Sequence, residues 1–145
     1  MQFRDNLALS CAVVDEGTNA NTYKTTQALS YTLDGRAYFK AATDNVAFTA
    51  GTALGNSQRC AFFVAINAAG TFSTIQGSIV TPSPSGDVAR AAEIPNPSDR
   101  VVIGAIVVTT GAAGTFTPGS TDLSAANVTF TTVNFAGDYG KTIPL

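Results

Sequence analysis

Histidine and tryptophan are absent from the 145 residues of this chain, and only 12% of the residues are charged. Histidine is the side chain that most often transfers protons near neutral pH, and it is the commonest metal ligand. Its absence removes the Ser-His-Asp and Cys-His arrangements and most zinc sites. No paired-carboxylate or nucleophile motif takes their place, so we expect a structural or binding protein with no catalytic activity, cofactor or metal.

Charged residues of both signs are scarce: the net charge is −2, with three Lys and two Glu in the whole chain. A soluble monomer usually covers its surface with such residues, so much of this surface must be hydroxyl and amide or be covered by partners. The eight Lys and Arg residues are scattered along the sequence. Because each phosphate contact needs a basic side chain, we expect no nucleic-acid partner.

Long apolar runs are also missing, since none approaches the ~20 residues of a membrane span. The first five residues lack the apolar centre of a signal peptide. We therefore expect synthesis in a cytoplasm and no membrane partner.

Cysteine is limited to Cys11 and Cys60, which lie 49 residues apart with no CxxC pair. Both have apolar neighbours in the sequence, which indicates two small buried core residues. A reducing cytoplasm keeps such cysteines as free thiols, which is our prediction, with a disulfide as the alternative.

What the chain does contain is a series of short Val, Ile, Phe and Thr runs between Gly-, Asn- and Asp-rich turns, typical of β-structure. Residues 7–13 alternate and predict a strand, with a short helix over residues 5–17 as the competitor. The apolar face of that strand would carry Leu7, Leu9, Cys11 and Val13.

A hairpin is the clearest local signal. Asp34-Gly35 separates residues 29–33 from residues 36–40 and supplies the positive φ values that a type I′ turn requires. This register places Tyr31 opposite Tyr38. Residues 43–45 then predict a turn into a strand over residues 46–50.

Two segments, residues 59–67 and 101–108, are apolar on both faces, and residues 71–80 return as the partner of the first. Strands of this kind are covered on both sides, whereas a sandwich core covers only one face of each sheet. The second face needs a loop, an arm or another subunit. We predict a subunit contact there, with Phe63, Val102 and Ile106 as its residues.

In the last third, the apolar positions change phase: Val128 and Phe130 are even, whereas Val133 and Phe135 are odd. One extra residue near 131–132, a β-bulge, would place all four side chains on the same side of the strand.

Residues 81–99 hold four of the six prolines and show no periodicity, and a loop of this length is usually functional. The tail over residues 137–145 reads as extended and suited to serve as an arm. We predict that this loop and the two termini reach a larger partner, with Asp87, Arg90 and Glu93 as contact residues.

Together these patterns predict an all-β protein, an antiparallel β-sandwich of jelly-roll-like type, formed by residues 1–145 as one domain. Other chemistry is poorly supported. Asp15, Asn19 and Asn21 lack the spacing and the bidentate Glu of an EF-hand calcium loop. The four tyrosines offer rings for sugar stacking, but without Trp and with few carboxylates they favour carbohydrate binding only weakly.

Several segments resemble small β-rich virion proteins of tailed bacteriophages and prophages, over a stretch from Leu29 to Phe130. The segments are Tyr31-Thr32-Leu33-Asp34-Gly35-Arg36-Ala37-Tyr38-Phe39-Lys40-Ala41, Ala42-Thr43-Asp44-Asn45, Phe63-Val64-Ala65-Ile66-Asn67-Ala68-Ala69-Gly70-Thr71, Ile103-Gly104-Ala105-Ile106-Val107-Val108 and Phe116-Thr117-Pro118-Gly119-Ser120-Thr121-Asp122-Leu123-Ser124-Ala125-Ala126.

The resemblance implies a capsid cement or decoration protein with a jelly-roll-like fold, seated on the exterior of an icosahedral head. The major capsid protein would then be its partner. Because one self-complementary patch can serve equivalent sites of a lattice, we also expect the protein to bind itself, as a homodimer in preference to a trimer. It carries over no catalytic residues. The alternative function is a phage tail or receptor-binding module that recognises carbohydrate.

Overall fold

A computed structural model describes residues 6–82, 91–134 and 142–145 of the chain. These residues contain no helix, and hence none that could cross a membrane, and their strands pair antiparallel throughout. The all-β antiparallel sandwich is therefore confirmed. The strands are β1 (Leu7–Ala8), β2 (Val14–Glu16), β3 (Thr22–Thr25), β4 (Leu29–Leu33), β5 (Arg36–Lys40), β6 (Thr43–Ala47), β7 (Arg59–Asn67), β8 (Phe72–Gln76), β9 (Ala91–Glu93), β10 (Arg100–Thr110), β11 (Val128–Asn134) and β12 (Thr142–Pro144).

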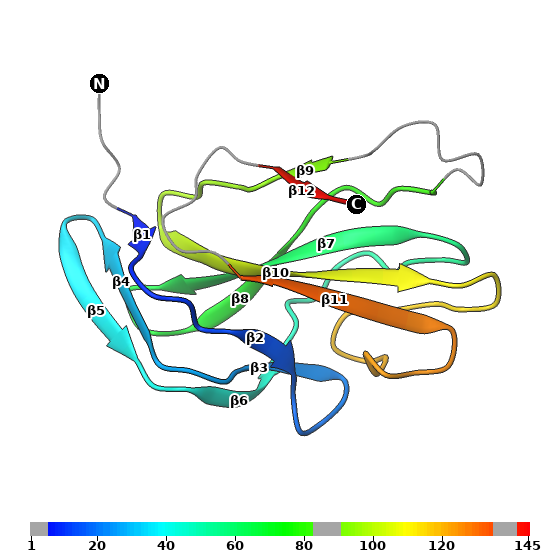
Figure 1. Ribbon diagram of the computed structural model, residues 1–145, viewed down its shortest axis with the longest axis horizontal. Coiled ribbons are helices and arrows are strands. Elements are labelled where there is room, and N and C mark those ends of the chain that lie inside the picture. The colour runs from blue at the N-terminus through cyan, green and yellow to red at the C-terminus, as the bar shows by residue number, and fades with distance from the viewer. Residues whose placement is uncertain (1–5, 83–90, 135–141) are drawn as a thin grey trace.

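The strands form layers around one central sheet (Figure 1). The central sheet has the order β11-β10-β7-β8. On one side lie two three-stranded sheets, β1-β4-β5 and β2-β3-β6, and on the other side lies the two-stranded ribbon β9-β12. These sheet orders do not establish a jelly-roll topology, which stays a prediction.

The larger hydrophobic cluster fills the space between the central sheet and the two three-stranded sheets. Phe48, Phe62 and Phe116 meet edge to face at its centre, with ring centroids 5.5 to 5.8 Å apart. This is the favoured geometry for aromatic rings, because the positive edge of one ring faces the negative face of the next.

A second, smaller cluster lies on the opposite side of the central sheet, under the β9-β12 ribbon. Phe63 and Val102 of the central sheet belong to it, together with Ile94 from the segment after β9 and Ile143 of β12. The second face of the doubly apolar strands is thus covered by β9, the segment after it and β12 of the same chain.

A β-bulge in β10 divides its side chains between the two clusters. Val102 pairs with Ala65 and Gly104 with Val64, so Ile103 has no partner on β7. An extra residue of this kind reverses the alternation that follows it. Gly104 is required next to the bulge, because an added Cβ would lie 2.9 Å from the backbone oxygen of Val133.

The bulge predicted in β11 is wrong, since β11 pairs with β10 in unbroken register from Val128 to Asn134. The change of apolar phase has another cause, which is that β11 contributes apolar side chains to both clusters. Val128 and Phe130 contact the larger cluster, and Val133 contacts the smaller one. Phe135 lies outside the described residues.

The prediction for residues 7–13 is wrong in two respects. The segment is not one strand, because β1 ends at Ala8 and β2 begins at Val14, with Val13 at a φ of +50° between them. Its buried side chains are the even ones, Ala8, Ala12 and Val14, whereas Leu9 and Cys11 are exposed. On the core side of β4, the large Tyr31 fills the space. Its register partner on β1 is the small Ala8, which is buried beside it.

The β4-β5 hairpin is confirmed in register and in turn type. Tyr31 pairs with Tyr38, and their rings stack 5.3 Å apart at 19°. Asp34 and Gly35 have φ values of +51° and +73°, as a type I′ turn requires. The turn expected at residues 43–45 is instead the start of β6, within which Asn45 adopts a φ of +55°.

Candidate functional site

The three residues predicted for a subunit contact are buried inside the chain, and that prediction is wrong. Phe63, Val102 and Ile106 are 2%, 3% and 0% exposed. The ribbon covers Phe63 and Val102, whereas Ile106 faces the larger cluster on the other side of the sheet. No surface of another molecule reaches these side chains while the fold is intact.

Of the residues predicted to contact a larger partner, Asp87 and Arg90 lie outside the described residues. Glu93 is exposed on β9, where it pairs with Thr142 of the tail. Its contact with a partner stays a prediction.

The structure places a different apolar surface on the outside, on the sheet β1-β4-β5. Its outward positions are Leu7, Ser30, Thr32, Ala37 and Phe39, and together with the exposed Leu9, directly after β1, they are here named the outer face. Leu9 and Phe39 are 57% and 70% exposed, and they are the two large hydrophobic side chains exposed in the described part of the chain.

Leu9 and Phe39 flank the same residue of β4. The Leu9 N–H donates to the Ser30 carbonyl at 2.8 Å, and Phe39 is the register partner of Ser30. Cross-strand neighbours on one face lie about 5 Å apart at Cβ. The two apolar side chains therefore stand on either side of a small hydroxyl residue, on a face whose six positions carry no charge.

Phe39 points outward because of the register of the β4-β5 hairpin. Tyr31 and Tyr38 occupy the core side of β4 and β5, so period-two alternation turns their neighbours Ser30 and Phe39 to the outside. The Tyr31 hydroxyl donates to the Asn67 carbonyl at 2.8 Å, which ties the hairpin to the end of β7. Both burial and Tyr38 raise the pKa of Tyr31.

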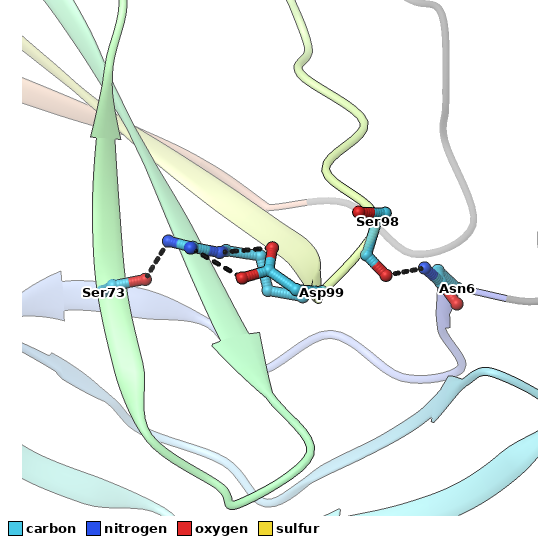
Figure 2. Close-up of polar contacts among 5 residues, drawn as sticks. Asn6, Ser73, Ser98 and Asp99 are labelled. Atoms are coloured by element: carbon cyan, nitrogen blue, oxygen red, sulfur yellow. Dashed lines mark hydrogen bonds and ion pairs between the residues drawn. The ribbon is translucent and has the colours of Figure 1, made fainter.

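A bond from Asn6, which precedes β1, joins this sheet to the start of β10, where Arg100 in turn contacts β8 (Figure 2). The buried Asn6 side chain donates to the Ser98 carbonyl at 3.2 Å, and its Oδ1 accepts from the Asp34 N–H at 3.0 Å. Next to Ser98, Arg100 forms an ion pair with Asp99 at 2.9 Å and donates to Ser73 Oγ at 3.2 Å. The outer face is therefore carried by a sheet anchored at its turn.

Arg36 and Lys40, the two basic residues of β5, lie at the ends of that strand rather than on the outer face. The Lys40 ammonium lies 5.7 Å from the centroid of the Phe72 ring, within cation–π range. The centre of the outer face is thus free of charge, and positive charge lies at its margin.

A second polar cluster joins the loop after β2 to the start of β6. Asp44 accepts from the Thr18 hydroxyl and from the Thr18 N–H, and Asn45 Oδ1 accepts from the Asn19 N–H at 2.7 Å. These bonds from Thr18 lower the pKa of Asp44. Asn21 is used differently, since its amide donates to the Gly119 carbonyl at 3.2 Å.

Elsewhere in the described ranges, few side chains are suited to metal binding or acid–base catalysis. They hold no group of three Cys, Asp or Glu side chains able to bind a metal ion. The shifted pKa values all move away from neutrality: a bond from Arg100 lowers that of Asp99, and burial raises that of the Cys60 thiol to about 11. A general acid–base catalyst needs the opposite, a pKa close to the working pH.

Comparison with known proteins identifies no relative. No protein-family model, no curated protein and no solved structure matches the chain. The assignment of the outer face as the candidate site therefore rests on this chain's own residues alone. Sequence reasoning identified the alternation of Leu7, Leu9 and Cys11 but assigned the face to the core. The available signal was the small size of Ala8 and Ala12, which suits a crowded interior.

Proposed function

We propose that this chain is a capsid decoration, or cement, protein of a tailed bacteriophage, and that it binds the exterior of the icosahedral head through the outer face. The observation that carries the proposal is the exposure of Leu9 and Phe39 on one uncharged face of an anchored sheet. Exposed apolar patches on soluble proteins mark interaction sites.

The chemistry of the outer face selects the kind of partner. The centres of protein interfaces are poor in charged residues and rich in aromatic ones, which matches a face with Phe39 and no charge. Nucleic acid would need Lys and Arg at the centre, and this face has them only at its margin. The fitting partner is an apolar, uncharged protein surface.

The sequence resemblance supports the major capsid protein as that partner. The protein would then be made in the host cytoplasm and reside on the virion, and the jelly-roll-like topology belongs to the same proposal. A small contact is sufficient for this role, because many copies bind a repeating lattice and together hold neighbouring capsid subunits in place.

The test is co-sedimentation of the purified protein with capsids that lack it. Phe39→Asp places a charge in the centre of the outer face, and we expect capsid binding to fall at least about tenfold. The matched control is Thr115→Asp, which adds the same charge at an exposed position outside the strands and should leave binding unchanged. Thermal unfolding checks that both variants fold.

Two results overturn the proposal. In the first, the wild-type protein does not sediment with capsids and instead binds a glycan on a glycan array. This result would support the tail or receptor-binding alternative. Capsid binding that survives Phe39→Asp and Leu9→Asp together shows that the outer face is not the contact.

A further inference from the structure

The outer edge of β11 is free of backbone pairing in the part of the chain that the structure describes. β11 is the last strand of the central sheet, with β10 on one side. The described backbone bonds outside the ladders include none from residues 129–134. An unpaired edge is a template for another strand, and proteins usually protect it.

The backbone groups that point away from β10 follow from the ladder. Thr110 pairs with Val128, but the Thr110 N–H donates to Gln58 and the Val128 N–H to Ala125, so this pair is not hydrogen-bonded. Antiparallel ladders alternate bonded and non-bonded pairs. The N–H and C=O groups of Phe130 and Thr132 therefore point outward.

Other edges of the described sheets carry protection that β11 lacks. The edge of β8 is covered by residues 49–52: Thr49 and Thr74 exchange two hydrogen bonds of 3.0 Å, and Gln76 bonds Thr52 twice at 2.8 Å. The edge of β5 carries Arg36 and Lys40 at its ends. By contrast, β11 has seven residues and contains no charge, Pro or Gly.

We propose that β11 is the dimerisation edge of this protein, and that the occupant is β11 of a second copy. A two-fold axis through Thr131 places the two strands antiparallel. Phe130 then lies opposite Thr132 of the partner subunit, so the outward backbone groups of both residues meet their complements. The two four-stranded sheets join into one continuous sheet across the axis.

The absence of charged residues favours β11 over the edge strand β5 for self-association. Along β11 the opposed side chains are Thr131 with itself and Thr129 with Val133, all uncharged and all suited to strands. The same symmetry applied to β5 would place Arg36 opposite Lys40 of the partner subunit, and like charges directly opposite are destabilising. A two-fold contact also needs a self-complementary surface, which β11 supplies.

This inference goes beyond the proposed function and does not depend on it. β11 is an edge of the central sheet, whereas the outer face belongs to the separate sheet β1-β4-β5 (Figure 1). Dimerisation is measured without capsids, so failure of one proposal leaves the other in place.

The experiment measures the mass of the purified protein by sedimentation velocity. We expect a dimer, and we expect Thr131→Lys and Thr131→Glu each to raise its dissociation constant about a hundredfold, because each places like charges across the axis. An equimolar mixture of the two variants should restore a dimer, since the opposed charges are then complementary. Thr115→Lys, which adds the same charge outside the strands, should remain dimeric.

Thr132→Pro is a second, independent variant. It removes an outward N–H that has no described partner, and proline is tolerated on an edge strand in that orientation. We expect a folded monomer. A wild-type monomer at the highest soluble concentration overturns the inference, as does a dimer that persists in both Thr131 variants and in Thr132→Pro.

Discussion

Val102 and Ile106 lie four residues apart on β10, yet their side chains enter the two different hydrophobic clusters on opposite sides of the sheet. Residues separated by four normally share a face of a strand. The bulge at Ile103 inserts one residue between them and reverses the alternation. Through this relationship a single strand contributes to both cores.

The first prediction concerns β10, whose side chains enter both cores. Ile106→Ala should lower the free energy of unfolding by about 2–5 kcal/mol, because the site is fully buried and loss of the side chain leaves a cavity. Val102→Asp in the smaller core and Ile106→Asp in the larger core should each fail to fold, since each buries an unpaired charge. Guanidinium unfolding followed by circular dichroism measures this, and a stably folded Ile106→Asp protein would contradict it.

The second prediction concerns the ribbon over the smaller core. Ile143→Ala should cost about 2–5 kcal/mol, whereas Thr142→Ala, exposed on the same strand, should change stability by less than about 0.5 kcal/mol. Deletion of residues 87–93 should also destabilise the fold, because it removes β9, the partner of β12. Equal effects of the Ile143 and Thr142 substitutions would show that the tail does not pack as described.

A matched pair of tyrosines supplies the third prediction. The buried Tyr23 hydroxyl has no hydrogen-bond partner among the described residues, whereas Tyr31 donates to Asn67. Burial without a partner costs free energy, so Tyr23→Phe should be neutral or stabilising by up to about 1 kcal/mol. Tyr31→Phe should instead lose about 0.5–1.5 kcal/mol. Thermal unfolding compares the two, and the opposite order of stabilities refutes the prediction.

The fourth prediction distinguishes the two cysteines, which are both free thiols. Cys11 is exposed, whereas Cys60 is buried, and its burial raises the pKa of that thiol to about 11. The thiolate is the reactive form, so Ellman's reagent at pH 8 should modify Cys11 in the native protein and Cys60 only after denaturation. Absence of free thiols in denatured, non-reduced protein would establish a disulfide and overturn this expectation.

The fifth prediction is a pH dependence at the loop after β2. Bonds from Thr18 lower the pKa of Asp44 in the folded state. Their stabilising effect is therefore complete above the unfolded pKa of about 3.9 and is lost as the pH falls through the lower folded value. Thr18→Val removes the hydroxyl donor and should raise the pKa of Asp44 in an NMR titration. Asp99, whose pKa is lowered by Arg100, serves as the internal control and should not change.

Local sequence patterns alone determined two parts of the fold, the β4-β5 hairpin and the strand β7. Asp34-Gly35 forms the type I′ turn because few other dipeptides accept two positive φ values, and the turn then sets the pairing of Tyr31 with Tyr38. The continuous apolar run of residues 59–67 likewise predicted β7 with its observed bounds, and its coverage on both faces.

Tertiary structure decided which side of each strand is inside. Alternation shows that Leu7 and Leu9 share a face, but period two is the same whether that face meets the core or solvent. Here Tyr31 fills the interior beside Ala8, and the leucines point outward. The bulge at Ile103 and the ribbon that covers Val102 also depend on contacts between distant segments. Such contacts leave no local signal, which is why the outer face and the β11 edge emerge only from the folded chain.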